Sequence, residues 1–360
     1  MTEHAPSTAG ATSVRDSNVA VVTVNYRTPE LTELCIAALA KEREALPRLR
    51  VVVVDGGSGD GSADRLAKTF SRPEYLDWVE FLPMPINGGF GWANNQGIRA
   101  LLRGTQPPDY IQLLNPDAEV MLGAVEALVK YLATNRRVAA VGSQLIDPDG
   151  TPAGSAFSFP SIRGEFSRGA RTGALDRLLR VPPISIEATE PLEVDWVTGG
   201  SVMFRVEALK QVGLFDEGFF LYNEEIELMW RLRKAGWIIA TEPRSRVRHV
   251  GGVATGVHDR EVPGPVEPRR PAYLYRSRAR FFGLARGRTG AAIAFAAFLA
   301  GHLIWKGRRL LRVSSGKPVD HEFRDHVRLG RPHLSDFTAA VASPDDEIGQ
   351  APAWMERRWL

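Results

Sequence analysis

Short runs of apolar residues alternate with segments of helical spacing along the first 140 residues. The run Val19–Val24 is rich in β-branched residues and ends at a polar loop, as a buried strand does. The segment Pro29–Leu46 follows, with apolar residues at helical spacing and a proline in its first turn. Such alternation predicts an α/β fold with a single, mainly parallel, twisted sheet covered by helices on both faces. The order recurs, with strands predicted at 50–54, 78–82, 110–114 and 138–141 and helices at 63–70, 93–102 and 123–133.

The pattern is weaker in the second half of the chain. Residues 150–190 are rich in Gly, Pro, Ser and Arg and have no clear periodicity, which predicts a long mobile connection inside one domain. Regular patterning then returns, with strands predicted at 194–204, 237–241 and 246–250 and a helix at 223–234.

The composition is that of a soluble globular protein. Of 360 residues, 44% are hydrophobic and 24% are charged, which argues against a largely disordered chain. Cys35 is the only cysteine, which excludes an intrachain disulfide and a cysteine-cluster metal site. The polar N-terminus lacks the apolar core of a signal peptide, so a cytoplasmic location is expected. The predicted organisation is a disordered tail at 1–18, one domain at 19–255, a basic helical extension at 256–315 and a polar tail at 316–360.

The net charge of +3 hides a segregation of charge. Residues 269–312 contain eleven Lys or Arg and no Asp or Glu, so the remainder of the chain carries −8. Within this basic block, the fifteen residues 291–305 are uncharged apart from His302, but they fall short of the about 20 that span a bilayer. Two interpretations remain open: a helix lying on an anionic membrane surface, and a helix packed on the domain with solvated basic flanks. Nucleic-acid binding is disfavoured because no strand platform of aromatic residues is recognisable.

Polar residues follow the first two predicted strands. The first loop, Asn25-Tyr26-Arg27, contains no glycine, which argues against the Gly-rich turn of a nicotinamide-binding fold. Asp55 ends the second strand, at the sheet edge where ligands bind, and a carboxylate there can accept hydrogen bonds from a base or a ribose hydroxyl. Gly56 and further glycines follow and permit tight turns. The alternative role of Asp55 is to cap this loop.

A third loop, at the start of a predicted helix, is rich in asparagine and glycine. The stretch 87–97 contains three Asn and four Gly, among them Asn87, Gly89 and Asn94. Free N–H groups at a helix start bind phosphate, and asparagine amides add directed donors. The alternative is that these residues only stabilise the loop.

Acidic and imidazole groups appear at three further places. Asp117, in the turn Asn115-Pro-Asp117 after the fourth predicted strand, can ligate a hard divalent cation. His249 ends a later strand and can complete a metal site if the two strand ends converge. Glu224 and Glu225 lie in the first turn of a predicted helix, where a carboxylate could take a proton from a substrate hydroxyl. The plainer interpretations are an ordinary turn, a structural histidine and carboxylates that stabilise the helix dipole.

In this order, the motifs resemble those of inverting glycosyltransferases of family 2, which have the GT-A fold. The resemblance covers residues 19–255, and several ordered matches are more specific than any one motif. The matches are Val-Thr-Val-Asn-Tyr at 22–26, Val-Val-Asp-Gly-Gly-Ser-Gly-Asp-Gly-Ser at 53–62, Asn-Gly-Gly-Phe-Gly-Trp-Ala-Asn-Asn-Gln-Gly at 87–97, Leu-Leu-Asn-Pro-Asp at 113–117, Thr-Gly-Gly-Ser at 198–201 and Phe-Leu-Tyr-Asn-Glu-Glu-Ile-Glu-Leu at 220–228.

The resemblance implies a role for each matched residue. Asp55 would read the nucleobase. Asp117 would be the last aspartate of the family's Asp-x-Asp metal motif, in which Asn115 replaces the first, and His249 would be a further ligand of Mg²⁺ or Mn²⁺. Glu225 would be the base that deprotonates the acceptor hydroxyl, with Glu224 as the alternative. The expected nucleotide-sugar contacts are Asn25, Tyr26, Arg27, Asp55, Gly56, Asn87, Gly89, Asn94, Asn115, Gly199 and Gly200.

The Asn-Pro-Asp and His-Val-Gly-Gly segments look most like those of bacterial rhamnosyl- and galactofuranosyltransferases of cell-wall polysaccharide assembly. The resemblance implies an inverting transfer of L-rhamnose from dTDP-rhamnose to a saccharide or polyprenyl-linked acceptor, at the inner face of the cell membrane. The alternative is a galactofuranosyl or other hexosyltransferase that uses a UDP-sugar. A catalytically silent sugar-nucleotide-binding or nucleic-acid-binding protein is the non-enzymatic alternative, and the intact Asp117, Glu225 and His249 argue against it.

Overall fold

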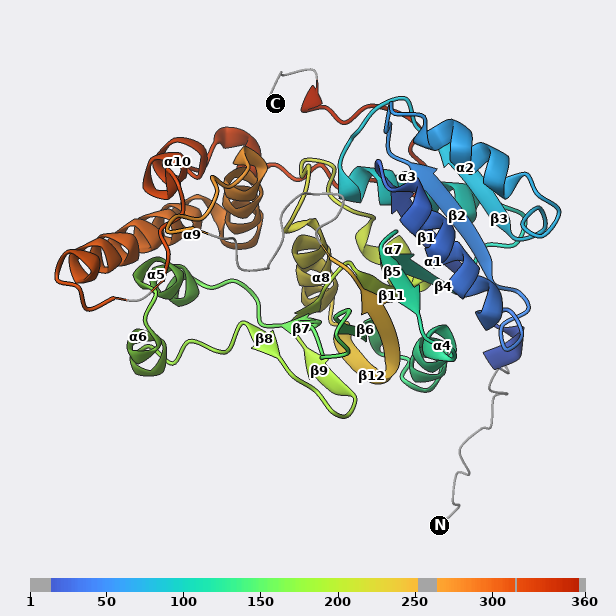
Figure 1. Cartoon of the computed structure of the whole chain (residues 1–360), viewed down its shortest axis with the longest axis horizontal. Helices are drawn as coiled ribbons and strands as arrows, with labels where there is room; N and C mark the ends of the chain where they lie inside the picture. The colour runs from blue at the N-terminus through green and yellow to red at the C-terminus, as the bar shows by residue number, and fades with distance from the viewer. Residues whose placement is uncertain (1–13, 252–263, 315, 356–360) are drawn as a thin grey trace, which may run out of the picture.

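The computed structural model describes residues 14–251, 264–314 and 316–355 and is built on a nine-stranded sheet (Figure 1). The strand order is β3-β2-β1-β4-β11-β6-β12-β5, and β9 pairs with β12. The strands are β1 (Val19–Asn25), β2 (Arg50–Asp55), β3 (Val79–Pro83), β4 (Tyr110–Leu114), β5 (Ala118–Val120), β6 (Val138–Ile146), β9 (Leu192–Val194), β11 (Ser201–Arg205) and β12 (Ile238–His249).

The sheet is mixed. Strands β3, β2, β1 and β4 are parallel, and so are β6 and β12, as the sequence predicts. Strand β11 lies between these two sets and is antiparallel to both β4 and β6. The run at 194–204, predicted as one strand, is divided by Thr198–Gly200 into β10 (Trp196–Val197) and β11. The α/β class is confirmed. The antiparallel strand β11 between the two parallel sets is not revealed by the pattern of apolar residues.

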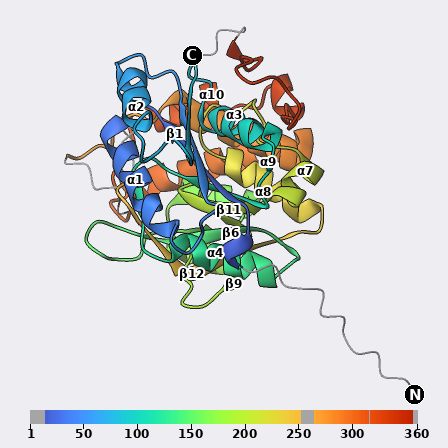
Figure 2. The same cartoon turned by 90° about the vertical axis from the view of Figure 1, so that its right-hand side faces the viewer.

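Helices cover both faces of the sheet and bury alternate strand residues. Val19 and Val21 belong to one hydrophobic core, while Ala20 and Val22 belong to the other, as the two-residue period of a strand requires. In Figure 2, α1 and α3 lie on opposite sides of β1. One face carries α1 (Pro29–Glu42), α2 (Ser62–Phe70) and α4 (Ala124–Thr134), and the other carries α3 (Phe90–Arg103), α7 (Val206–Val212) and α8 (Glu224–Lys234).

The segment 150–190 is more regular than predicted. It forms a small second sheet of β7 (Ala156–Phe157), β8 (Ser185–Ile186) and β10, together with the helices α5 (Ile162–Ala170) and α6 (Gly173–Leu178). Helix α5 packs against α9 (Ala272–Leu310) so closely that a Cβ on Gly169 would lie 2.3 Å from the Phe298 carbonyl oxygen. The glycines that suggest a loop therefore allow two helices to touch, and the expected mobile connection is corrected to an ordered one.

The C-terminal helical extension consists mainly of α9, which Gly287 interrupts with a non-helical conformation. Among the described residues, α9 is the one helix long and apolar enough to cross a membrane by length and composition, and a third of its apolar stretch is buried in the protein. Figure 1 shows α5, α6, α9 and α10 (Glu322–Leu329) grouped beside the sheet. The shorter elements are the 3₁₀ helices η1 (Val14–Asp16) and η2 (Leu334–Phe337).

The basic block at 269–312 is partly neutralised by acidic residues from elsewhere in the chain. Arg278 pairs with Glu165 of α5, and Arg280 lies 2.6 Å from Asp216. Arg269 lies 2.6 Å from Asp325 of α10. The charge segregation along the sequence is therefore reduced in the folded protein, because these pairs join residues far apart in the chain.

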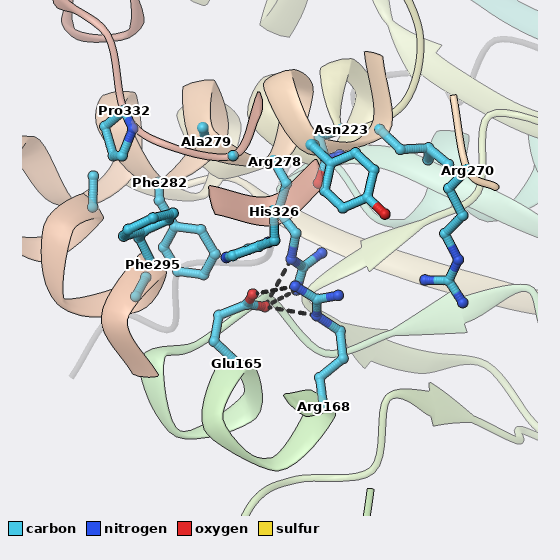
Figure 3. Close-up of a pocket in the computed structure, with 15 residues that line it drawn as sticks. Glu165, Arg168, Asn223, Arg270, Arg278, Ala279, Phe282, Phe295, His326 and Pro332 are labelled. Carbon is cyan, nitrogen blue, oxygen red and sulfur yellow. Dashed lines mark hydrogen bonds and ion pairs between the residues drawn. The ribbon is translucent and has the colours of Figure 1, made fainter. Parts of the chain in front are cut away.

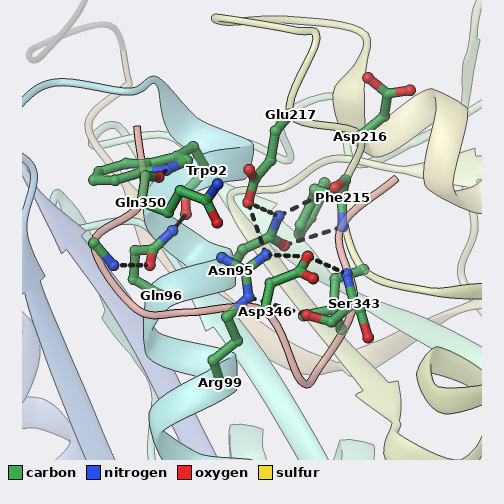
Figure 4. Close-up of polar contacts among 12 residues, drawn as sticks. Trp92, Asn95, Gln96, Arg99, Phe215, Asp216, Glu217, Ser343, Asp346 and Gln350 are labelled. Atoms are coloured by element: carbon green, nitrogen blue, oxygen red, sulfur yellow. Dashed lines mark hydrogen bonds and ion pairs between the residues drawn. The ribbon is translucent and has the colours of Figure 1, made fainter. Parts of the chain in front are cut away.

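The predicted polar tail is packed on α3 over residues 340–350, here called the C-terminal strap (Figure 4). Arg99, which is 1% exposed, lies 2.9 Å from Asp346 and donates to the Ser343 carbonyl at 3.0 Å. The Trp92 indole donates to the Gln350 carbonyl at 2.8 Å. Polar residues that suggest a loose tail are therefore partners for the buried polar groups of α3.

Candidate active site

The first part of the site is a hydrogen-bonded cluster at the ends of β1 and β2. Asn25 and Asp55 are paired in register, and the Asn25 amide donates to Asp55 Oδ2 at 2.7 Å. The Ser58 backbone N–H and hydroxyl donate to the two Asp55 oxygens at 3.0 and 2.7 Å. Asp55 therefore caps its loop, as the plainer interpretation holds. These bonds use three of the about four acceptor positions of the carboxylate, and Asp55 is 1% exposed, so its contact with a nucleotide stays a prediction.

Tyr26, Arg27 and Gly56 line the same loop. The Arg27 backbone has a left-handed φ of 58°, and its Nε donates to the Ser58 carbonyl at 3.0 Å. Its guanidinium lies over the Tyr26 ring at 5.1 Å from the centroid. The Gly56 N–H donates to the Asn25 carbonyl at 2.9 Å, which holds the two loops together. An aromatic ring and an exposed cation therefore stand beside the Asp55 cluster.

Glycines bring the start of α3 against the chain that leads into α8. Gly89 has a φ of +90°, and a Cβ there would lie 1.9 Å from the Phe220 carbonyl oxygen. That oxygen accepts the Phe90 N–H at 3.0 Å, while Asn87 accepts the Gly89 N–H at 3.0 Å. The Phe220 carbonyl thus holds the start of α3 in place. It also accepts the Phe90 N–H, one of the N–H groups expected to be free to bind phosphate.

The asparagines inside α3 have mainly structural partners. The Asn94 amide donates to the Phe90 carbonyl at 2.9 Å, within the helix. Asn95 accepts the Phe215 N–H and donates to the Phe215 carbonyl and to Glu217. The contact of Asn94 with a nucleotide sugar stays a prediction, and Asn95 instead joins α3 to the segment before α8.

Asp117 and His249 meet at the ends of β4 and β12, as the metal-site hypothesis requires. His249 Nε2 lies 3.2 Å from Asp117 Oδ1 and 3.2 Å from the Asn115 amide nitrogen. The Asn115 N–H donates to the Gly200 carbonyl at 3.0 Å, which brings the Gly199–Gly200 loop to the same place. Within the described residues no group of three His, Cys, Asp or Glu side chains could hold a metal.

The Asp117–His249 pair nevertheless fits a divalent cation. A carboxylate oxygen and an imidazole nitrogen face each other, and both are accepted ligands of Mn²⁺, whereas Mg²⁺ favours oxygen. Two protein ligands are enough when substrate phosphates and water complete the coordination. The metal roles of these two residues therefore stay predictions that the geometry allows.

Glu224 and Glu225 begin α8, after two residues, Tyr222 and Asn223, with left-handed φ of 67° and 66°. Glu224 is buried and Glu225 is partly exposed, and Oε2 of each has no hydrogen-bond partner within the described residues. Burial raises the pKa of Glu225 to about 7. Burial, reinforced by the neighbouring Glu225 charge, raises the pKa of Glu224 well above its usual range. Such a pair suits proton transfer near neutral pH.

Close contacts join these parts along one edge of the sheet. A Cβ on Gly57 would lie 2.5 Å from the Ile86 carbonyl carbon, and one on Gly199 would lie 3.1 Å from the Phe90 ring. A Cβ on Gly91 would lie 3.5 Å from Glu224 Cγ. These approaches link the segments that carry the predicted nucleotide, metal and base residues along the carboxyl ends of the parallel strands, and the roles of those residues stay predictions.

Sequence patterns did not indicate the residues that hold the segment before α8 in place. Asp216 is fully buried, accepts the Ala340 N–H at 2.8 Å and pairs with Arg280. Glu217 lies 3.1 Å from Arg99 of α3. Figure 4 shows Glu217, Asn95, Arg99 and Asp346 converging between α3 and the C-terminal strap. The partners are 64 to 124 residues apart, so no local motif could have revealed them.

Comparison with known proteins supports the expected chemistry. A family model described as glycosyl transferase family 2 matches residues 19–213. An N-acetylglucosaminyl-diphospho-decaprenol L-rhamnosyltransferase of Mycobacterium tuberculosis is 32% identical over 248 residues, which are 66% of this chain and 77% of that relative. The rhamnosyltransferase WbbL of Escherichia coli K12 is 29% identical over 153 residues, which are 41% of this chain and 55% of WbbL.

A solved structure is similar in fold across most of the chain. GalNAc-T7, crystallised with UDP, GalNAc and Mn²⁺, superimposes with a TM-score of 0.55 at 15% identity. The similarity covers 87% of this chain and 56% of that one. It confirms the fold class expected from the sequence.

Proposed function

Because the chain belongs to glycosyl transferase family 2 and is a glycosyltransferase, we propose that it transfers L-rhamnose from dTDP-rhamnose to a lipid-linked saccharide, with inversion at the anomeric carbon. The printed activities of two relatives, both rhamnosyltransferases, support this donor sugar. The decaprenol-linked substrate in one of those names supports the acceptor class.

The observation that carries the proposal is the chain of close approaches between the two pairs: Gly200 lies next to His249, Gly199 next to the Phe90 ring, and Gly91 of the same helix next to Glu224. The base removes the proton from the acceptor hydroxyl, and that oxygen attacks the anomeric carbon as the bond to the nucleoside diphosphate breaks. A divalent cation held by Asp117 and His249 would neutralise charge on the departing diphosphate. Asn25, Arg27 and Asp55 would hold the nucleotide at the neighbouring strand ends.

A donor screen tests the proposal. Purified protein is incubated with dTDP-rhamnose, UDP-galactofuranose, UDP-glucose or GDP-mannose, with Mn²⁺ and a polyprenyl-diphosphate-linked N-acetylglucosamine acceptor, and nucleotide release is measured. We expect release of dTDP from dTDP-rhamnose at least about tenfold faster than release from any other donor. Faster turnover of a UDP-sugar would replace the rhamnosyl assignment with the alternative, and no acceptor-dependent release from any donor would refute the proposal.

We also propose that the second half of α9 binds an anionic membrane surface from the cytoplasmic side. Large apolar side chains are exposed beside basic ones at its end, and Leu310 and Leu311 are 85% and 73% exposed. Exposed apolar and cationic groups side by side suit the boundary between lipid head groups and acyl chains. The exposed residues are Leu303, Ile304, Lys306, Arg309, Leu310, Leu311, Arg312 and Val313.

Sedimentation with liposomes tests this membrane surface. We expect the protein to pellet with phosphatidylglycerol-containing vesicles at low salt and to be released by high salt, since each basic residue near such a surface contributes about 1 kcal/mol. Replacing Leu310 and Leu311 by Ser should weaken binding, whereas the matched pair Leu76 and Leu122, exposed elsewhere, should tolerate Ser without effect. Protein that stays in the supernatant with anionic vesicles at low salt would contradict the proposal.

A further inference from the structure

A cavity of about 180 Å³ lies between α5, α9 and α10, outside the sheet-edge site (Figure 3). Its walls are of two kinds. Polar side chains come from Glu165, Arg168, Asn223, Arg270, Tyr275, Arg278 and His326. Apolar side chains come from Leu274, Ala279, Phe282, Ala291, Ala294, Phe295 and Pro332.

Two polar side chains in this cavity are buried without partners. Tyr275 is 7% exposed, and its hydroxyl has no hydrogen-bond partner within the described residues. His326 is 6% exposed, and neither ring nitrogen has a hydrogen-bond partner within the described residues. Burial, reinforced by the nearby Arg168 charge, lowers the pKa of His326 to about 3, so the ring is neutral. Figure 3 shows the His326 ring between Phe295 and the arginines. Buried polar groups are normally paired, so these two indicate that a ligand supplies the missing partners.

The charge of the cavity favours an anion. Arg168 and Arg278 both pair with Glu165, so one buried carboxylate is shared by two guanidinium groups. Burial alone would raise the pKa of Glu165. The two arginines outweigh this effect and lower the pKa of Glu165 to about 2. Arg270 is exposed at the same cavity and lies 3.7 Å or more from its nearest carboxylates, Glu267 and Glu322. Excess guanidinium groups with a free hydroxyl are donors suited to phosphate oxygens.

The cavity adjoins the candidate base. Asn223, which also lines it, directly precedes Glu224 and Glu225. An anionic group bound here therefore lies beside the start of α8, where the acceptor hydroxyl must be deprotonated. The cavity is smaller than the roughly 300 Å³ of a pocket for a drug-sized molecule, so it suits a head group with the beginning of a chain.

From this placement we propose that the cavity binds the diphosphate group of a polyprenyl-diphosphate-linked acceptor. The arginines and Tyr275 contact the phosphate oxygens, and the apolar wall formed by α9 contacts the first isoprene units. The proposal rests on the proposed function, because it names the site for the acceptor of that reaction.

Calorimetric titration of the full-length protein tests this site without turnover. The probe is farnesyl diphosphate, in excess chelator and without donor, so that the Asp117–His249 pair can hold no metal-bound diphosphate. Inorganic pyrophosphate and farnesol serve as comparison probes. We expect farnesyl diphosphate to bind about tenfold or more tightly than either, because only it contacts both walls. Equal binding of pyrophosphate would overturn the lipid-linked occupant, and equal binding of farnesol would overturn the phosphate site.

Two variants identify the cavity as the binding place. Tyr275→Phe removes only the unpartnered hydroxyl, so it should keep or raise the melting temperature while weakening farnesyl diphosphate binding several-fold. Arg270→Gln, just before α9, should weaken it about tenfold, and the control Arg286→Gln, in α9 but outside the cavity, should not. Unchanged affinity in both cavity variants would overturn the proposal. Since no donor is present, this result is independent of the donor screen: binding through the cavity without transfer would refute the proposed function alone.

Discussion

Glu225→Gln is expected to lower kcat by about 10²–10⁴-fold while nucleotide binding stays nearly normal. Glutamine keeps the shape of the side chain but cannot accept the proton of the acceptor hydroxyl. Because burial holds the pKa of Glu225 at about 7, the carboxylate form increases as the pH rises through neutrality. The kcat/KM of the unmodified enzyme should therefore rise with pH through about 7, and this rise should be absent in Glu225→Gln.

The control for this prediction is the neighbouring carboxyl group. Glu224→Gln should reduce turnover less, although Glu224 is the more buried of the two residues. Both variants should keep the melting temperature, because glutamine resembles the neutral carboxyl that burial favours. The anomeric configuration of the product, determined by NMR, should be inverted. Retention would show that the mechanism is wrong, and near-normal turnover by Glu225→Gln would show that the base is another residue.

Asp117→Ala should abolish most of the metal-dependent affinity for the donor. Changes in residues that only support metal ligands usually cost 10–100-fold, so loss of a direct ligand should cost about 100-fold or more. His249→Ala should act in the same direction, since its Nε2 faces the same Asp117 oxygen. The measurement is donor affinity, by competition with a fluorescent nucleotide, at several Mn²⁺ and Mg²⁺ concentrations.

The matched control for Asp117→Ala is Glu119→Ala, which removes an exposed carboxylate two residues away on β5. It should leave the metal dependence of donor binding unchanged. Full turnover in excess chelator, together with unimpaired turnover by Asp117→Ala, would contradict the metal role of this residue.

The parallel half of the sheet could be predicted because its information is local. The alternation of buried residues in β1 and β2 follows from two adjacent valine-rich runs that pack against helices on both sides. The position of β11 could not be predicted in the same way. Its orientation depends on which strands it pairs with, and those partners lie 60 to 95 residues earlier in the chain.

The candidate site likewise has parts that local sequence predicts and parts that depend on residues far apart in the chain. Asn25 and Asp55 end their strands, and Asn115 and Asp117 lie in the turn after β4, so the sequence indicated that they gather at one edge. The order of 150–190 could not be predicted, because Gly169 looks like a loop residue until α9 is placed against it. Likewise, no local pattern shows that Arg278 will find its carboxylate partner, Glu165, 113 residues away.

The C-terminal strap has a consequence for the order in which the protein can fold during synthesis. Arg99 and Trp92 of α3 bond to residues 244 to 258 positions later in the chain. While the ribosome is still translating the last part of the message, the nascent α3 has neither partner, and its buried guanidinium has no Asp346 to pair with. The N-terminal part of the sheet with its helix α3 therefore cannot complete its packing from the N-terminus forward, although domains usually begin folding that way. The final native contacts of the first hundred residues form only after the last few dozen have been made.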